Sequence, residues 1–494
     1  MNYIKTRKDS NYSNYIYIMK IRVPLMLFLA CAAGCSADPE PFGAVPDDAQ
    51  VKWQQMEMNM FMHFGPNTFS GLEWGKGDES EDIFNPEDLD CVQWAATASA
   101  AGFKGIIITA KHHDGFCLWP NPQSRHTVRQ SSWRDGQGDV LKELSEACRE
   151  KGLGFGVYVS PWDRNDPRYG TPEYNDVFVH TLESVLGDYG PVFEQWFDGA
   201  CGEGPDGRRQ VYDWPLFNYT VERLQPQAVI FSDVGPGCRW VGNEKGIAGL
   251  TNWSTLDTDG FAPGKQAPSV DTLRSGNVGG ANWIPAETDV SIRPGWFWRE
   301  SENDSVKDLQ TLLRIYYESV GRNSLLLLNV PPDTRGHIHE IDSTRLMEFR
   351  SALDTIFRDD LASGSEVSSS SRFSRAHRAD AVTDGAYDTY WAAAGSDELP
   401  CISLDFKREV SFNRVLVQEY IPLGQRIASF TIEARDSEGN WTKIGGGTTV
   451  GYKRIVLTPL TSATALRIKF DRTLASPVIS QIEVYLDELF EQVV

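Results

Sequence analysis

An acidic residue that follows an apolar run is the first candidate for chemistry in this sequence. Residues 192–198 read Val-Phe-Glu-Gln-Trp-Phe-Asp, and Gly199 comes next. Because side chains alternate along a strand, Glu194, Trp196 and Asp198 would share one face. If this face points into a (β/α) barrel, Asp198 lies at the C-terminal rim, where catalytic groups emerge in that fold. An Asp-Gly pair is also a frequent turn, so the pattern alone leaves both interpretations open.

Paired histidines follow another apolar run. The segment Lys111-His112-His113-Asp114-Gly115-Phe116 comes directly after residues 106–110, His63 ends a separate apolar run, and Tyr158 lies in the next predicted strand. Adjacent side chains point to opposite sides of an extended chain, so both histidines reach one site only if the chain bends, as Gly115 would allow. The spacing differs from that of a helical zinc site and no trio of carboxylates accompanies it, so we expect no metal here.

A regular alternation of helical and apolar strand patterns surrounds these residues. Helices are predicted over residues 88–101, 139–151, 173–186, 211–224, 304–321 and 341–357, and strands over residues 105–110, 154–159, 192–198, 228–231 and 324–329. This order is typical of a (β/α) barrel or of a doubly wound sheet. Polar and aromatic residues collect just after the strands, which favours a TIM-like (β/α) barrel over residues 36–362.

The composition changes after residue 362. Residues 363–371 are rich in Ser and Gly, which predicts a linker. Residues 372–494 show short alternating runs at 401–406, 414–419, 429–434, 454–457 and 465–470, a pattern typical of an antiparallel β-sandwich. Residues 381–385 (Ala-Val-Thr-Asp-Gly), with Thr389-Tyr390-Trp391, resemble the opening of discoidin-like (coagulation factor-type) modules. The resemblance implies a candidate carbohydrate-binding domain, and whether it binds sugar or calcium stays open.

The N-terminal residues 1–35 carry an export pattern. The basic stretch Met19-Lys20-Ile21-Arg22 precedes a short apolar segment at residues 23–33, which describes a secretory signal too short to span a bilayer. Ala32-Ala33-Gly34-Cys35 resembles a bacterial lipobox, although Ala stands where Leu is common. This resemblance implies acylation of Cys35 and an exported cell-envelope lipoprotein, periplasmic or on the cell surface, that meets the membrane only through its lipid. A plain secreted protein is the alternative.

Charge and cysteine content argue against several classes of function. The 494 residues carry a net charge of -21 at pH 7, which makes nucleic acid or an anionic membrane surface an unsuitable partner. The cysteines after Cys35 show no Cys-x-x-Cys spacing and no accompanying His ligands, so we expect no zinc site. These cysteines are Cys91, Cys117, Cys148, Cys201, Cys238 and Cys401, and single buried thiols are the expectation. The oligomeric state stays open.

The barrel region resembles the retaining α-L-fucosidases, a family of glycoside hydrolases. The motifs stand in the family's order over residues 51–332: His63-Phe64-Gly65, Glu73-Trp74, the paired-histidine segment, Trp196-Phe197-Asp198-Gly199 and Pro294-Gly295-Trp296. The resemblance implies a (β/α) barrel, Asp198 as nucleophile and fucosylated oligosaccharides or glycoconjugates as substrates. It also implies a fucose pocket drawn from His63, Glu73, Trp74, His112, His113, Tyr158 and Trp196. Trp296 would face the C5 methyl group of the sugar.

Members of this family place the general acid/base at different points of the chain. Glu244 matches the position used by the branch that cleaves α-1,3 and α-1,4 fucosyl linkages on branched, Lewis-type glycans. Glu287 is the rival, Glu203 is a third candidate, and Arg239 is a candidate for sugar binding. A retaining pair should stand about 5 Å apart, with the pKa of the acid raised by burial and by the charge of the nucleophile.

The sequence therefore predicts an exo-acting retaining α-L-fucosidase that needs no metal or organic cofactor. Two alternatives stay open: a non-catalytic, glycan-binding surface lipoprotein, and a retaining glycosidase for another sugar such as galactose. The intact Asp198 and the paired histidines argue against the first alternative. Under the second, the wall around Trp296 should leave room for a C6 hydroxyl group instead of fitting a methyl group.

Overall fold

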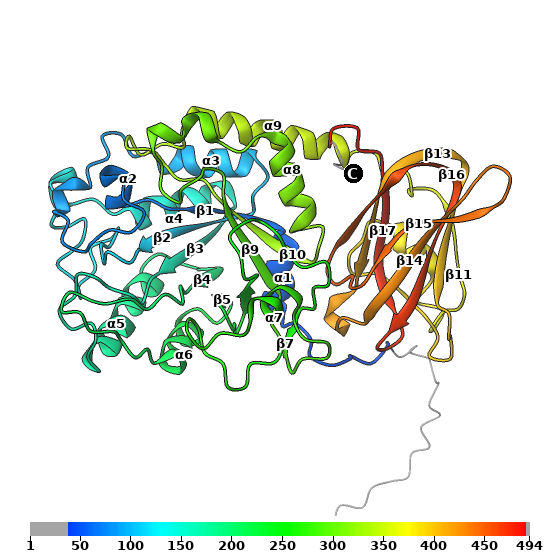
Figure 1. Cartoon of the computed structure of the whole chain (residues 1–494), viewed down its shortest axis with the longest axis horizontal. Coiled ribbons are helices and arrows are strands. Elements are labelled where there is room, and N and C mark those ends of the chain that lie inside the picture. Colours follow the sequence, from blue (N-terminus) through cyan, green and yellow to red (C-terminus); the bar gives the residue numbers. More distant parts are fainter. Residues whose placement is uncertain (1–37, 491–494) are drawn as a thin grey trace, which may run out of the picture. The chain divides into compact units, whose positions relative to one another are not determined.

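A closed barrel of parallel strands carries the catalytic candidates (Figure 1). The computed structural model describes residues 38–490. The barrel order is β1-β10-β9-β6-β5-β4-β3-β2, and every neighbouring pair is parallel, which confirms the predicted TIM-like fold. The strands are β1 (Met58–Met62), β2 (Gly105–Lys111), β3 (Gly154–Val159), β4 (Glu194–Trp196), β5 (Val229–Ser232), β6 (Cys238–Trp240), β9 (Ala286–Ser291) and β10 (Ser324–Asn329).

Helices lie outside the ring of strands, as α3, α8 and α9 show in Figure 1. The helices are α1 (Asp48–Met56), α2 (Pro66–Ser70), α3 (Cys91–Ala100), α4 (Val140–Lys151), α5 (Glu173–Gly187), α6 (Trp214–Leu224), α7 (Val270–Ser275), α8 (Leu309–Glu318) and α9 (Glu340–Ile356). The Asp139 side chain accepts a hydrogen bond from the Lys142 N–H and caps α4, and Gly152 ends the helix with φ +69°. Asp308 caps α8, which is therefore shorter than the predicted helix over residues 304–321.

Two barrel strands have no clear signal in the sequence. β6 has 3 residues, too few for a periodic pattern. β9 reads Ala-Glu-Thr-Asp-Val-Ser, and it is fully buried although Glu287 and Asp289 belong to it. Because β6 lies between β5 and β9 in the barrel, Glu244 follows β6, a strand that the sequence analysis did not predict.

Alternate strand positions fill the inside of the barrel. Phe61, Tyr158, Trp196 and Phe231 belong to one buried cluster, in which Trp196 stacks on Phe231 with ring centroids 3.9 Å apart. Glu194, two residues before Trp196, is also buried. The predicted inward face of β4 is therefore present, and Asp198 follows it along the chain at the C-terminal end of the strand.

Residues after the barrel form an antiparallel β-sandwich. Its strands are β11 (Glu366–Ser369), β12 (Trp391–Ala392), β13 (Cys401–Glu419), β14 (Ile427–Arg435), β15 (Trp441–Gly447), β16 (Arg454–Thr473) and β17 (Val478–Tyr485). Two of the predicted short runs belong to the single strand β13, and two others belong to β16. The pairing register of β13 with β16 shifts twice, between Asp405 and Val410 and between Phe412 and Arg414. Such irregularities let one strand bend between two layers.

The predicted linker at residues 363–371 is part of this sandwich. β11 pairs with residues 402–405 of β13, so the Ser-rich stretch is an edge strand and not a free connection. Trp391 is fully buried and packs with Phe470, with ring centroids 5.9 Å apart. Its indole is therefore part of the core and does not offer a surface for sugar.

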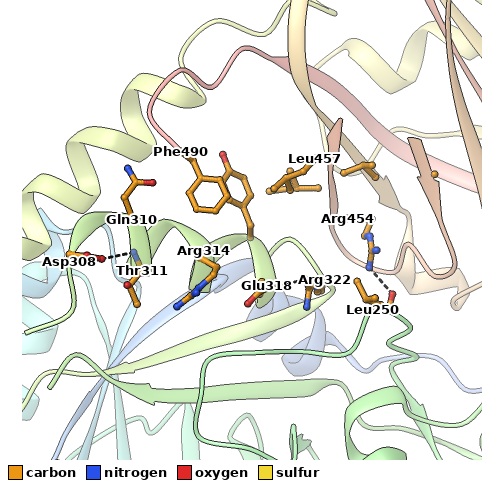
Figure 2. Close-up of a pocket in the computed structure, with 14 residues that line it drawn as sticks. Leu250, Asp308, Gln310, Thr311, Arg314, Glu318, Arg322, Arg454, Leu457 and Phe490 are labelled. Atoms are coloured by element: carbon orange, nitrogen blue, oxygen red, sulfur yellow. Dashed lines mark hydrogen bonds and ion pairs between the residues drawn. The ribbon is translucent and has the colours of Figure 1, made fainter. Parts of the chain in front are cut away.

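A cavity of about 520 Å³ lies against α8 (Figure 2). Arg314, Glu318 and Arg322 line it from α8 and the following turn, and Leu457 lines it from β16. It shares no lining residue with the cavity that contains Asp198. Within residues 38–490, no helix has the length and apolar character needed to cross a bilayer, and all cysteines are free thiols. The predicted signal segment and Cys35 lie outside the described residues.

Candidate active site

Asp198 is held by groups from three parts of the chain. Tyr158 Oη donates a hydrogen bond of 3.0 Å to Oδ2, and the Ala200 N–H donates one of 2.7 Å to Oδ1. His113 Nε2 lies 3.6 Å from Oδ2. The Asp198 side chain is still 27% exposed. The carboxylate is thus fixed in orientation and accessible to a substrate, as a nucleophile must be.

The chain bends after the paired histidines, as the sequence predicted. The Gly115 N–H bonds to the His112 carbonyl over 3.1 Å, and Gly115 has φ +91°, a conformation that favours glycine. The two imidazole rings lie with centroids 4.2 Å apart, and both contact Tyr158. His112 and His113 therefore belong to one site.

Burial keeps these imidazoles neutral. Burial lowers the pKa of His113 to about 4, although the Asp198 carboxylate acts in the opposite direction. Burial and the neighbouring His113 place the pKa of His112 well below its ordinary value. His113 Nδ1 also lies 2.8 Å from Ser160 Oγ. At neutral pH the contact between His113 and Asp198 is therefore a polar contact and not an ion pair, and neutral rings suit sugar hydroxyl groups.

His63 and Trp296 form an aromatic wall beside the histidines. The His63 ring lies 4.9 Å from that of Trp296 and 5.8 Å from that of His112. His63 Nδ1 lies 2.9 Å from Asn329 Oδ1, and burial lowers the pKa of His63 to about 3. The sequence did not single out Asn329, which ends β10 and holds both His63 and the Trp296 carbonyl.

Glu73 and Trp74 reach this region from the segment after α2. Glu73 Oε1 accepts a hydrogen bond of 2.7 Å from the Trp296 N–H, and Glu73 forms an ion pair with Arg299. Trp74 is 56% exposed, and its ring contacts those of His113 and Trp162 edge to face. Glu73 thus fixes the backbone of Trp296, whereas Trp74 offers an open aromatic surface at the edge of the site.

A cavity of about 420 Å³ contains both Asp198 and Glu244. Its other lining residues are Trp196, Gly199, Ala200, Cys201, Phe231, Asp233, Trp240, Gly264, Lys265 and Asp289. The histidines do not line this cavity, and Asp198 links the two groups through its contacts with His113 and Tyr158. The site therefore combines a neutral, aromatic part with a part rich in carboxyl groups.

Glu244 has the electrostatic setting of a proton donor. Its side chain lies in the loop after β6 and is partly open to solvent. Partial desolvation raises the pKa of Glu244, and the negative charge of Asp198 raises it further. A hydrogen bond from the Trp296 side chain acts against both effects. A carboxyl group whose pKa is raised beside a second carboxyl group fits the general acid of a retaining glycosidase.

Two further carboxyl groups in the cavity were not predicted. Burial and repulsion from Glu244 raise the pKa of Asp289 well above its ordinary value, while Trp240 Nε1 donates a 2.9 Å hydrogen bond to it. Burial raises the pKa of Asp233 to about 6. A Cβ atom on Gly199 would lie 2.6 Å from Asp233 Oδ2, so glycine is needed there. Like Asp198, Asp233 directly follows an apolar strand, and this pattern could have revealed it.

The rival acids do not line this cavity. Glu287 is fully buried, and its Oε1 accepts a 2.8 Å hydrogen bond from Trp196 Nε1. Glu203 belongs to a separate turn, where its backbone forms an isolated antiparallel bridge with that of Arg209. Among the three candidates, Glu244 alone shares a cavity with Asp198.

Arg239 is not a sugar ligand in this structure. It is fully buried, and its guanidinium donates to the carbonyl groups of Leu273, Ile284 and Trp253 and to Asn252 Oδ1. All of these partners lie in the segment between β6 and β9. The prediction that Arg239 binds sugar is therefore wrong, because the side chain holds this long segment in place.

We expect Arg239→Ala to lower the free energy of unfolding by about 3–5 kcal/mol, because several buried acceptors would lose their donor. Urea unfolding measures the loss, with Arg358→Ala, an exposed site, as the control. The KM of the remaining folded enzyme should stay close to wild type. A variant with wild-type stability and a strongly raised KM would show instead that Arg239 binds the sugar.

Comparisons with known proteins agree with this architecture. Residues 43–354 match the family model described as Alpha-L-fucosidase, and residues 366–483 match the F5/8 type C domain. Alpha-L-fucosidase 1 of Arabidopsis thaliana is 43% identical over 457 residues, which cover 91% of this chain and 89% of that protein.

Solved structures extend the similarity to three dimensions. A putative alpha-L-fucosidase from Bacteroides ovatus is 44% identical, with a TM-score of 0.78, and the match covers 90% of this chain and 75% of that one. A Ruminococcus gnavus GH29 fucosidase in complex with fucose is 32% identical, with a TM-score of 0.83 over 92% of this chain and 97% of that one. The chain therefore belongs to the alpha-L-fucosidase family of glycoside hydrolases and carries a C-terminal F5/8 type C domain.

Proposed function

We propose that this fucosidase is exo-acting and retaining, and that it removes terminal α-L-fucose from α-1,3 and α-1,4 linkages on branched, Lewis-type glycans. The observation that carries the proposal is the shared cavity of Asp198 and Glu244, in which the charge of one raises the pKa of the other. Retaining hydrolysis requires such a pair of carboxyl groups with different protonation states. The linkage preference rests on the position of Glu244, which resembles that of the α-1,3/1,4-specific branch.

The reaction proceeds in two displacements. Asp198 attacks the anomeric carbon and forms a covalent fucosyl-enzyme ester, while Glu244 gives its proton to the leaving glycosidic oxygen. Glu244, now ionised, takes a proton from water, and the resulting attack on the anomeric carbon releases fucose and frees Asp198. Atoms and charge balance without a metal or organic cofactor, and we propose that none takes part. Whether the C-terminal domain binds calcium is a separate question, which a calcium titration of the protein followed by calorimetry would answer.

The neutral imidazoles, Glu73 and Trp74 are proposed to bind the sugar. His63, His112 and His113 offer donors and acceptors to hydroxyl groups without adding positive charge. Trp296, which contacts His63, supplies an apolar surface for the C5 methyl group of fucose. A galactoside would place a C6 hydroxyl group against this ring, so the corresponding aryl galactoside should be a poor substrate.

The hydrogen bond from Trp296 to Glu244 predicts a change in pH dependence. This bond favours the charged form of Glu244, so Trp296→Phe should raise the pKa of Glu244 further. A general acid acts while it is protonated, and therefore the alkaline limb of kcat/KM should move to higher pH in this variant. The pH profile with a Lewis-type trisaccharide tests this. A limb that stays in place or moves to lower pH contradicts the role of Glu244.

Fucose release by the purified protein tests the proposed function. The substrates are a Lewis-type trisaccharide, an α-1,2-fucosylated disaccharide, an aryl α-L-fucoside and the corresponding aryl α-L-galactoside. We expect release from the branched trisaccharide to exceed release from the α-1,2-linked disaccharide by about tenfold or more, a difference of about 1.4 kcal/mol. Equal rates on the two glycans would contradict the proposed linkage preference. Release of galactose from the aryl galactoside faster than release of fucose from the aryl fucoside would show that the enzyme acts on galactose instead.

We also propose export and lipid attachment through Cys35, on the strength of the sequence pattern at residues 19–35. Expression of the full chain in a bacterial host with a fatty-acid label tests this proposal. Label that enters the wild-type protein and not Cys35→Ser supports the anchor. Export without label would instead support a secreted enzyme.

A further inference from the structure

A second pair of carboxyl groups lies inside the barrel and takes no part in the proposed reaction. Glu194 comes from β4 and Glu287 from β9, strands that are not neighbours in the barrel. Both side chains are 0% exposed, and a carboxyl oxygen of each lies within 4.8 Å of one of the other across the interior. A hydrogen bond between two carboxyl groups requires a proton on one of them.

Indole groups bind this pair from both ends. Trp53 Nε1 donates a 2.7 Å hydrogen bond to Glu194 Oε2, and Trp196 Nε1 donates one of 2.8 Å to Glu287 Oε1. Cys238 Sγ lies 3.7 Å from Glu194 Oε1. Glu287 Oε2 is buried and has no hydrogen-bond partner. The pair thus stands in a continuous row from Trp53 to Trp196, and Trp196 lines the cavity that contains Asp198.

The charges around the pair also disfavour full ionisation. In residues 38–490, no Lys, Arg or His forms an ion pair with Glu194 or Glu287. Asp289, two residues after Glu287, is a further acid, and burial and repulsion from Glu194 raise the pKa of Glu287 well above its ordinary value. The guanidinium of Arg239, the residue after Cys238, donates its hydrogen bonds to Leu273 and Asn252 in another segment. Two carboxylates in contact without a cation cannot both be charged.

We propose that Glu194 and Glu287 share one proton, and that the resulting pair positions the indole of Trp196 beneath the sugar site. Glu287 is then a positioning residue and not a general acid. The proton stays on the pair during catalysis, so no bond to it forms or breaks in the reaction. This inference rests on the proposed function only in that Trp196 borders the bound sugar.

Glu287→Gln imitates the protonated acid. Its amide N–H can donate to Glu194, and its carbonyl can accept from Trp196, so the row from Trp53 to Trp196 is kept. Glu287→Leu has a similar volume and loses both bonds. We expect kcat/KM of Glu287→Gln to stay within about threefold of wild type, and that of Glu287→Leu to fall about tenfold or more, mainly through KM, because the sugar-facing ring is no longer held. Glu222→Gln, an exposed acid on α6, is the matched control.

An infrared difference spectrum detects the proton without reference to activity. Wild type minus Glu287→Gln, recorded at pH 7, should contain the C=O stretching band of a protonated carboxyl group, and the band should shift in deuterium oxide. Loss of this band together with near-normal activity in Glu287→Gln is the expected result. Because the spectrum needs no substrate, it tests the shared proton even if the enzyme acts on a sugar other than fucose.

Three outcomes would overturn the inference. The first is the absence of the carboxyl band in wild type. The second is a loss of activity in Glu287→Gln as large as in Glu287→Leu that azide restores, since this marks a general acid/base. The third is a bound metal ion, because Glu194, Cys238 and Glu287 offer ligand atoms within 4.8 Å of one another. Elemental analysis that finds one metal ion per chain would show that a metal, and not a shared proton, holds the two carboxyl groups together.

Discussion

Asp198→Ala is expected to lower kcat for an aryl α-L-fucoside by about 10⁴-fold or more, because no covalent intermediate can form without the nucleophile. The hydrogen bonds from Tyr158 and Ala200 fix this carboxylate, and no other carboxyl group in the cavity shares them. Sugar binding should persist, since the imidazoles and Trp296 are unchanged. Steady-state kinetics and fucose binding by calorimetry measure the two effects separately.

Azide rescue identifies the nucleophile among the nearby acids. In Asp198→Ala, azide can enter the space of the missing carboxylate and attack the anomeric carbon, so the fucosyl azide should have inverted configuration. Asp188→Ala, an exposed position at the end of α5, serves as the control for folding and should keep wild-type kinetics. An Asp198→Ala enzyme with more than about one-tenth of wild-type kcat would remove Asp198 from the mechanism.

Glu244→Gln is expected to lower kcat/KM for the Lewis-type trisaccharide by about 10²- to 10⁴-fold, the usual contribution of a positioned proton donor. The amide keeps the size of the side chain and cannot give up a proton. The loss in kcat/KM should be much smaller for an aryl fucoside with an acidic leaving group, because that group departs without protonation and kcat/KM does not include the later hydrolysis of the fucosyl-enzyme ester. Parallel kinetics on the two substrates measure the difference.

The product of azide rescue separates Glu244 from every other acid. In Glu244→Gln the fucosyl-enzyme ester still forms on Asp198, and azide then attacks from the face that water would use, which gives fucosyl azide of retained configuration. The alkaline limb of the pH profile should also disappear. Equal losses on both substrates, without rescue, would show that Glu244 acts through the structure of its loop and not as the acid.

Short-range patterns in the sequence determined much of the catalytic frame. Alternation along residues 192–198 placed Glu194 and Trp196 on the inward face of β4, and Gly115 allowed the bend that brings His112 and His113 together. Asp139 and Gly152 marked the ends of α4. These features depend on local geometry, namely the period of a strand, the conformations open to glycine and the hydrogen bonds of a helix end, and local geometry can be read from neighbouring residues.

Only the tertiary structure decided which acid meets which partner. Glu287 and Asp289 share one face of β9 and differ by two residues, about 7 Å along a strand. The register of β9 against β10 and β6 sets Asp289 in the cavity and leaves Glu287 hydrogen-bonded to Trp196 in the interior. The burial of Arg239 and the pairing of the Ser-rich β11 are likewise set by distant segments. The sequence determined which groups are present and which face of a strand they occupy. Their burial and their hydrogen-bond partners depend on strand register, and register is fixed by contacts between residues far apart in the chain.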